Sequence, residues 1–201
     1  MARNIHSTAV VGNPLRWLQG CVPPDSVEPA TITLPESIYV GPFATIGEGV
    51  ILGEGVVLDA YCSVEPYASI GTNSILIYRA WVGGDAKIGR DCVIGGFVPE
   101  NAVIGDRCRV FGNLVHTHRD TTMSWDHHET PEPSVTVLED SFVGFGATVA
   151  GGFSVGPRAY VCAGSIVTRP VPPDHIACGV NEICHFTAWH GQLRENPIFR
   201  R

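Results

Sequence analysis

The stretch LPESIYVGPFATIGEGVILGEGVVLDAYCSVEPYASIGTNSILIYRAWVGGDAKIGRDCVI, residues 34 to 94, decides the fold of this chain. Every sixth residue in it is a branched aliphatic, and glycine usually follows. The aliphatic positions are Leu34, Val40, Ile46, Leu52, Leu58, Val64, Ile70, Leu76, Val82, Ile88 and Ile94. A fixed period of this kind is the signature of a solenoid.

The period also predicts which side chains point inward. Six is an even number, so side chains that alternate along a strand return to the same face in every repeat. Four residues after most of the aliphatics comes a small residue that should lie beside the next one: Ala44, Cys62, Ala68, Ser74, Ala80, Ala86 and Cys92. The glycines that follow the aliphatics predict tight corners with a permissive backbone. We therefore expect very short strands, joined by corners and stacked coil on coil.

Two interruptions break the period. From Ile94 to Ile104 the step is ten residues, and Pro99-Glu100-Asn101 is predicted to form a small loop that leaves the coil. A longer interruption covers residues 116–136 and holds four of the eight histidines: His116, His118, His127 and His128. Long segments without structure of their own are usually functional or disordered. The repeat resumes at valine in every case: Val137, Val143, Val149, Val155, Val161 and Val167.

The repeat resembles the hexapeptide-repeat family of left-handed parallel β-helices, in which three repeats make one triangular coil. The handedness is implied by the resemblance alone. The last coil is similar to that of the acyl-CoA-dependent transferases in this family, through Ala163-Gly164-Ser165, Ile166-Val167, Thr168, Arg169 and Val171-Pro172. The sequence then departs from the family pattern, because Gly179-Val180-Asn181-Glu182 replaces a glycine followed by Pro-Ala.

These patterns predict one all-β domain. We expect an irregular lead-in at residues 1–33, a β-helix over 34–173 with an excursion loop at 116–136, and a C-terminal segment at 174–201. Residues 182–194 are predicted to form a short helix, because Ile183, Phe186, Trp189 and Leu193 share one face.

Composition narrows the possible partners and the compartment. The net charge is −7 and no basic run exists, which argues against nucleic acid. No apolar stretch is long enough to span a membrane, and the first residues lack the apolar core of a signal peptide, so we expect a cytoplasmic protein. Cys62, Cys92 and Cys108 fall on small inward positions and are predicted to fill the core. Without a C-x-x-C pair, no structural zinc site is indicated.

The resemblance implies acyl transfer from acetyl-CoA or another acyl-CoA to a small acceptor. A thioester is already activated, so the reaction needs a base near the acceptor and donors near the thioester oxygen. A loop histidine is the expected base, and His116 and His118 are the candidates because the chain leaves the coil there. Asp120 or Asp126 would orient the ring. The alternative is that these histidines are merely solvated.

The resemblance also implies a cofactor groove and a homotrimer with grooves between subunits. We expect CoA to bind along Gly146, Ala147, Ala163 and Gly164, with Thr168, Arg169 and Arg158 nearby for polar and phosphate contacts. Corner geometry alone is the alternative explanation for the small residues. The Thr-Pro-Glu-Pro-Ser run at residues 130–134 favours a sugar or nucleotide-linked sugar as acceptor, by analogy.

Two other functions remain open. A metal enzyme resembling the γ-class carbonic anhydrases would use His116 and His118, with His127 or His128 as a third ligand, although the Arg-Gly-Asp segment of that family is absent. A non-catalytic scaffold is the second, and the histidine-rich loop argues against it. The bulky residues Tyr78, Arg79 and Trp81 are interpreted as surface or subunit contact, with a place beside the substrate as the alternative.

Overall fold

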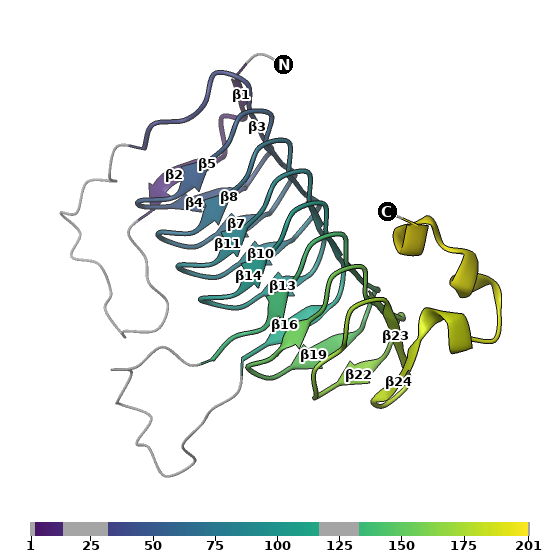
Figure 1. Ribbon diagram of the computed structural model, residues 1–201. Helices are drawn as coiled ribbons and strands as arrows, with labels where there is room; N and C mark the ends of the chain where they lie inside the picture. The colour runs from purple at the N-terminus through teal and green to yellow at the C-terminus, as the bar shows by residue number, and fades with distance from the viewer. Residues whose placement is uncertain (1–2, 14–31, 117–132, 201) are drawn as a thin grey trace, which may run out of the picture.

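The computed structural model of this chain is a parallel β-helix with three long sheets. It describes residues 3–13, 32–116 and 133–200. Each coil contributes one short strand to each sheet, and equivalent strands of successive coils pair in parallel (Figure 1). The all-β solenoid predicted from the repeat is confirmed.

The strands fall into sheets of ten, eight and six among the described residues. The ten-stranded sheet contains β1 (Asn4–Ile5), β3 (Tyr39–Val40), β6 (Val57–Leu58), β9 (Ile75–Leu76), β12 (Val93–Ile94), β15 (Arg109–Val110), β18 (Phe142–Val143), β21 (Tyr160–Val161), β23 (His175–Cys178) and β24 (Glu182–His185). The eight-stranded sheet contains β2 (Val10–Asn13), β4 (Thr45–Gly47), β7 (Ser63–Val64), β10 (Trp81–Val82), β13 (Phe97–Val98), β16 (Asn113–Val115), β19 (Thr148–Ala150) and β22 (Ile166–Val167). The six-stranded sheet contains β5 (Ile51–Leu52), β8 (Ser69–Ile70), β11 (Lys87–Ile88), β14 (Val103–Ile104), β17 (Thr136–Val137) and β20 (Ser154–Val155).

Three edges join these sheets, and we name them by the order in which the chain meets them. The first edge lies between the ten- and eight-stranded sheets, the second between the eight- and six-stranded sheets, and the third between the six- and ten-stranded sheets. Residues at the same edge of neighbouring coils lie one strand spacing apart, about 4.8 Å.

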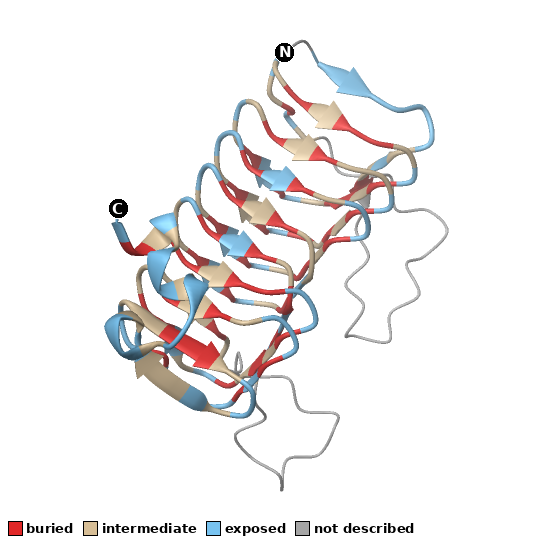
Figure 2. Cartoon of the chain, turned by 90° about the vertical axis from the view of Figure 1, so that its right-hand side faces the viewer, coloured by how far each residue is buried: buried red, intermediate tan, exposed pale blue. Residues whose placement is uncertain are grey.

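The core fills the inside of the coils, as the repeat predicts. The second residue of nearly every two-residue strand is buried, while the first is partly or fully exposed (Figure 2). Ile46, Leu58 and Val149, for example, are fully buried. The cysteines predicted to fill the core are buried, and burial raises the pKa of the Cys62 thiol to about 11.

The first interruption differs from its prediction. Pro99-Glu100-Asn101 does not leave the coil, because Phe97–Val98 forms strand β13 and Val98 is fully buried. The step from Ile94 to Val98 is four residues, and so is the step from Val110 to Leu114. Four is even, so the inward face is preserved. Two first-edge corners are therefore two residues shorter than the others.

These short corners require glycine because neighbouring backbones touch there. A Cβ on Gly96 would lie 1.9 Å from the carbonyl oxygen of Gly112, and one on Gly112 would lie 2.5 Å from that of Ala147. The glycines that follow the aliphatics are required for the same reason, the close approach of neighbouring backbones. The sequence alone had instead suggested a permissive backbone. A Cβ on Gly53 would lie 2.5 Å from the amide nitrogen of Thr72, whereas the positive φ angles occur two residues later, as at Gly55.

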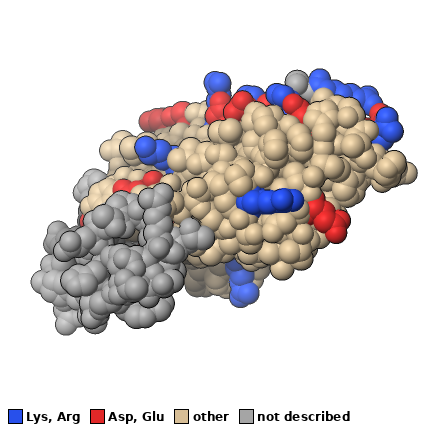
Figure 3. Space-filling model, turned by 60° about the horizontal axis from the view of Figure 1, so that its bottom comes forward, with Lys and Arg blue, Asp and Glu red and all other residues tan. Residues whose placement is uncertain are grey.

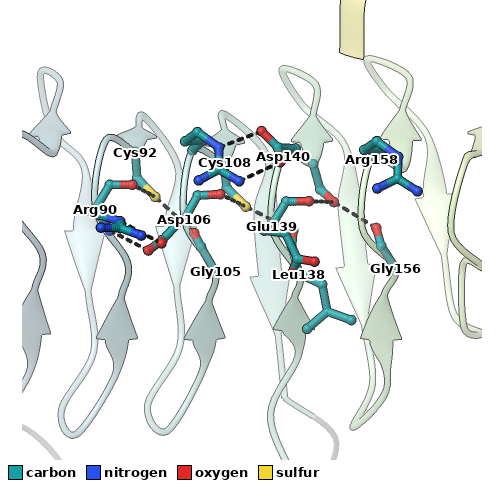
Figure 4. A network of polar contacts seen from close by, with 12 residues as sticks. Arg90, Cys92, Gly105, Asp106, Cys108, Leu138, Glu139, Asp140, Gly156 and Arg158 are labelled. Atoms are coloured by element: carbon teal, nitrogen blue, oxygen red, sulfur yellow. Dashed lines mark hydrogen bonds and ion pairs between the residues drawn. The ribbon is translucent and has the colours of Figure 1, made fainter. Parts of the chain in front are cut away.

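Charges alternate along the third edge. The column Asp91, Arg107, Asp140, Arg158 and Asp174 occupies equivalent corner positions, all with positive φ. The Arg107 guanidinium donates to both carboxylate oxygens of Asp140 at 2.8 and 2.7 Å, and Arg158 does the same to Asp174 at 2.7 and 2.8 Å. Arg90 and Asp106 form a further pair at this edge (Figure 4). These hydrogen bonds link successive coils.

Both ends differ from the sequence predictions. Residues 4–5 and 10–13 of the expected irregular lead-in form strands that pair in parallel with β3 and β4, which extends the coil. At the other end, residues 182–185 are strand β24, antiparallel to β23, rather than the start of a helix. Three 3₁₀ segments follow it: η2 (Phe186–Ala188), η3 (Gln192–Glu195) and η4 (Pro197–Arg200). Stacking of Phe186 on Phe199 at 4.7 Å holds this tail together.

Candidate functional site

His116 lies at the second edge, directly after strand β16. Its Nδ1 is 3.6 Å from Oε2 of Glu100, which occupies the same corner one coil earlier. Both side chains are partly exposed, at 29% and 27%. This separation is that of an ion pair rather than a hydrogen bond. A carboxylate so placed can orient an imidazole and stabilise the charge it gains on accepting a proton.

A second carboxylate lies at the same edge, at the end of strand β7. Glu65 is half-buried, and it accepts hydrogen bonds from the Trp81 indole and from Ser63 Oγ at 3.4 Å. Burial raises the pKa of the Glu65 carboxyl, and the negative charge of Glu100 adds to this. The hydrogen bonds from Trp81 and Ser63 act in the opposite direction. The charge of Glu100 therefore acts on the Glu65 carboxyl although one coil lies between the two residues.

An aromatic pair stands beside these groups on the outer face of the eight-stranded sheet. The rings of Trp81 and Phe97 stack at 4.3 Å with 6° between their planes. Phe97 remains 38% exposed. Sequence reasoning overlooked Glu65, Glu100 and Phe97. The signal that could have found Glu100 is its spacing from His116, which equals one coil once the four-residue step is recognised.

The predicted cofactor residues do not share one surface. Gly146 and Gly164 lie at the first edge with φ of 67° and 68°, and a Cβ on either would meet nothing within 4 Å. Ala163 is exposed next to Gly164. Ala147 is fully buried inside the coil, and its carbonyl accepts from the Asn113 amide at 2.8 Å. Ala147 therefore has no surface to offer a ligand.

The short coil before Gly146 leaves the Gly146 amide without its usual acceptor. At regular first-edge corners the positive-φ residue donates its amide to the preceding coil, as Arg79 does to Ala60 at 3.2 Å and Gly164 to Phe145 at 2.9 Å. The coil before Gly146 lacks the two residues that would supply this acceptor. Within the described parts of the chain, the amides of Phe145 and Gly146 donate no backbone hydrogen bond.

Thr168 and Arg169 lie at the second edge, in the same corner as His116 but two coils further along. Asn181 binds Thr168 through two hydrogen bonds. Its Oδ1 accepts from the Thr168 amide at 2.8 Å, and its Nδ2 donates to Thr168 Oγ1 at 2.8 Å. Arg169 donates to the Asn181 carbonyl and is exposed. Arg158 is instead bound to Asp174 at the third edge, so its guanidinium is already engaged.

The remaining loop residues lie outside the described ranges. These are His118, His127, His128, Asp120 and Asp126. In residues 3–13, 32–116 and 133–200, no group of three histidine, cysteine or acidic side chains is arranged to hold a metal. Across the same residues, none of the helices has the length and apolar character needed to cross a membrane.

Comparison with known proteins gives matches over part of the chain. No family model matches it. Serine acetyltransferase of Salmonella typhimurium is 36% identical over 99 residues, which cover 47% of this chain and 34% of that protein. Serine acetyltransferase of Bacillus pumilus is 32% identical over 78 residues, 39% of this chain and 36% of that protein. The chain thus spans about a third of the length of these curated relatives.

Among solved structures, a mutant of perosamine N-acetyltransferase from Caulobacter crescentus, in complex with CoA and GDP-perosamine, aligns with a TM-score of 0.44 and 23% identity. It covers 70% of this chain and 54% of the other. UDP-N-acetylglucosamine acyltransferase from Francisella novicida gives 0.42 and 14%, covering 89% and 65%. The strand pairing of the chain itself defines the fold.

Proposed function

We propose that this chain, a hexapeptide-repeat protein similar in sequence to the acyltransferases of that family, transfers an acyl group from acyl-CoA to a small acceptor. The acceptor provides a hydroxyl or an amine, and we favour a sugar or nucleotide-linked sugar. The observation that carries the proposal is the His116–Glu100 pair, directly after strand β16. A base of this kind is what acyl transfer from a thioester requires.

In the proposed reaction, the acceptor oxygen or nitrogen attacks the thioester carbonyl and passes its proton to the histidine. The new O–C or N–C bond forms, the C–S bond breaks, and the proton is returned to the CoA sulfur. Glu100 holds the ring and stabilises its positive charge while it carries the proton. His118 is the other candidate base. Single alanine variants of His116 and His118 distinguish the two candidate bases.

The backbone around Gly146 and Gly164 supports a place for the pantetheine arm of CoA. Both glycines leave open space, and the amides of Phe145 and Gly146 have no backbone acceptor among the described residues. Pantetheine carries amide carbonyls that can accept from such donors. Ala163 adds a small exposed side chain beside them, and Thr168 and Arg169 are proposed contacts at the second edge.

We further propose that the active unit is a homotrimer with sites shared between subunits. The first-edge glycines and His116 lie at different edges of the same chain, so one copy would supply the cofactor surface and another the base. Figure 3 shows one face on which charged side chains are sparse over most of the described surface, as suits a subunit contact. Closed cyclic symmetry is the usual arrangement of identical subunits.

The test combines binding with turnover. We expect CoA to bind in calorimetry, and acetyl-CoA to release free thiol when a suitable acceptor is present. His116→Ala or His118→Ala should lower kcat by about 10²–10⁴-fold while CoA binding persists. His190→Ala, at an exposed position of the tail, is the control. No heat and no thermal shift with millimolar CoA would remove the assignment. A stoichiometric metal in the purified protein would favour the metal enzyme instead.

Complementation tests the shared site. His116→Ala and Gly164→Trp should each be inactive, the first through the base and the second through the cofactor surface. Protomers of the two variants, mixed and reassembled, should regain activity because some interfaces combine two intact halves. A monomer in light scattering, or no regain on mixing, would contradict the trimer and leave the reaction itself untouched.

A further inference from the structure

Three cysteines lie together at the C-terminal end of the coil and outside its core. Cys162 follows strand β21, Cys178 ends strand β23, and Cys184 belongs to strand β24. All three are partly exposed, whereas the cysteines on the inward positions of the repeat are buried. The three thiols therefore fill no core position, and they are open in part to small molecules.

Cys162 and Cys178 stand opposite one another on adjacent strands. Val161 of β21 pairs in parallel with Ala177 of β23. The Cys162 amide donates to the Ala177 carbonyl at 2.8 Å, so the ladder continues to the pair Cys162 and Cys178. Side chains alternate along a strand, and both thiols therefore lie on the face opposite to the buried Val161. Neighbours of this kind are about 4.8 Å apart, and a disulfide needs Cα atoms about 4.4–6.8 Å apart.

Cys184 is less well placed for a bond to Cys178. In the antiparallel pairing of β23 with β24, Cys184 stands opposite Ile176, and Glu182 stands opposite Cys178. Cys184 is thus a diagonal neighbour of Cys178, and such neighbours are roughly 7–8 Å apart. Cysteines whose Cα atoms are more than about 7 Å apart are not bridged without backbone movement. The register favours Cys162 as the partner of Cys178.

The surroundings of Cys162 indicate the order in which the two thiols react. Burial raises the pKa of the Cys162 thiol to about 12, and the neighbouring thiols of Cys178 and Cys184 add to this. Cys162 is therefore protonated at neutral pH, and it is not the thiol that attacks first. Once the Cys178 sulfur is part of a disulfide, it no longer raises the pKa of Cys162, and Cys162 can attack in turn.

A second pair of neighbouring cysteines, in the core, provides a comparison. Cys92 and Cys108 occupy equivalent inward positions of successive coils (Figure 4). Both are fully buried, and their thiols donate to the carbonyls of Gly105 at 3.1 Å and Leu138 at 3.0 Å. The two pairs share the same spacing, and only the outer pair is open to solvent. We therefore expect only the outer pair to react in the folded protein.

A bond between Cys162 and Cys178 would act on the end of the coil. Strand β23 is the last strand of the parallel stack, and only β24 and the C-terminal tail follow it. A terminal repeat contacts a neighbour on one side only, so the ends of a solenoid open more readily than its middle. A covalent link from β21 to β23 would oppose this opening.

We propose that Cys162 and Cys178 form a disulfide by exchange with a small organic disulfide, and that this bond fastens strands β23 and β24 to the coil. The Cys178 thiolate attacks one sulfur of the small disulfide, whose S–S bond breaks and releases one small thiol. The Cys162 thiolate then attacks the Cys178 sulfur, the protein S–S bond forms, and the second small thiol leaves. The protons of the two cysteines end on the two small thiols, so the cysteine pair is oxidised and the small disulfide is reduced. The modification is independent of the proposed acyl transfer.

Hydroxyethyl disulfide is the probe, because it is uncharged and Glu182 stands opposite Cys178. The reduced, folded protein is incubated with it, quenched with acid, and digested with proteases that cut at acidic residues. Cuts at Asp174 and Glu182 place the three cysteines in different peptides. We expect mass spectrometry to find the Cys162 and Cys178 peptides joined until a reductant is added, with the core cysteines unmodified. The link should form faster as the pH rises, because the thiolate is the nucleophile.

Serine variants and amide hydrogen exchange assign the link and its effect. Cys184→Ser is the matched control and should form the same link. Cys162→Ser should stop at a mixed disulfide on Cys178, and Cys178→Ser should form neither product. Oxidation of the unmodified protein should slow amide exchange in residues 175–185 by about tenfold or more, and the same treatment of Cys162→Ser should not.

Four results would overturn the proposal. A link between Cys178 and Cys184, or mixed disulfides without any link in the unmodified protein, would contradict the pairing. Reaction of Cys92 and Cys108 as fast as the outer pair would show that exposure does not select the site. Unchanged amide exchange in the linked protein would mean that the bond does not fasten the end of the coil.

Discussion

The Nδ1 of His116 lies 3.6 Å from Oε2 of Glu100, because a shortened coil places the two residues at the same corner of successive turns. They are 16 residues apart in the sequence, whereas a coil of three six-residue repeats would need 18. Had the corner at Phe111-Gly112 kept two more residues, a different residue would stand above Glu100. The length of this corner therefore decides which residue stands above Glu100.

Glu100 is expected to act as a positioning residue for His116. Glu100→Gln should lower kcat, by less than the ~10²–10⁴-fold expected of His116→Ala, because the ring keeps its nitrogen but loses its anchor. Steady-state rates at saturating acetyl-CoA measure this. Glu100→Asp, which restores the charge, should recover part of the rate, with CoA affinity unchanged throughout. A loss that Glu100→Asp does not repair, accompanied by a lower melting temperature, would mean that Glu100 is merely structural.

The inward column should carry the stability of the coil. Leu52 is 7% exposed and its neighbour Ile51 is 68% exposed on the same strand. Leu52→Ala should reduce the free energy of unfolding by about 2–5 kcal/mol, while Ile51→Ala should stay within about 0.5 kcal/mol. Denaturant titration of both variants measures the difference. Equal effects would show that the two faces of the strand are not distinguished by burial.

The short first-edge corner should tolerate no side chain at Gly96. A Cβ there would overlap the Gly112 carbonyl oxygen, and backbone cannot move as a flexible side chain can. Gly96→Ala should cost at least about 1–3 kcal/mol of unfolding free energy. Gly84→Ala, whose nearest neighbour would be at 3.3 Å and whose φ is not positive, should change stability by no more than about 1 kcal/mol. Thermal unfolding of the pair distinguishes close approach from a general demand for glycine.

The third-edge ion pairs should make stability depend on acid. Hydrogen bonds from Arg158 hold the pKa of Asp174 below its usual value, so the charged carboxylate is favoured in the folded state. This contribution is fully present above the unfolded pKa of about 3.9 and is lost as the pH falls through the lower folded value. Asp174→Asn should therefore lower the melting temperature at neutral pH, by the equivalent of about 1 kcal/mol or less. The difference should shrink in strong acid.

Glu36→Gln is the control for that experiment, since Glu36 is exposed and lies outside the charge column. Its melting temperature should follow that of the unmodified protein at every pH. If the gap between Asp174→Asn and the unmodified protein were as wide in strong acid as at neutral pH, the ion pair would not be its cause.

Much of the fold follows from the sequence alone. A six-residue period has even parity, so every aliphatic from Val40 to Val167 on the repeat falls on the inner face, whichever coil it belongs to. The excursion loop at residues 116–136 is predicted for the same reason, because the aliphatic repeat stops after Val115, and it stays a prediction. His116 was thereby identified as a candidate without any knowledge of its neighbours.

What the tertiary structure decided is which residues stand above one another. The two four-residue steps keep the aliphatic side chains on the inner face, as six-residue steps do. A search for a period of six therefore cannot distinguish a short corner from a loop. The close contact of Gly96 with Gly112 is what shows that these corners are short. The stacking of coils then pairs Glu100 with His116, engages Arg158 with Asp174, and places Ala147 inside the coil. Inside and outside are properties of a single strand and can be read locally. Neighbours across coils depend on the length of every corner between them, and that length is set by backbone contacts that no single repeat contains.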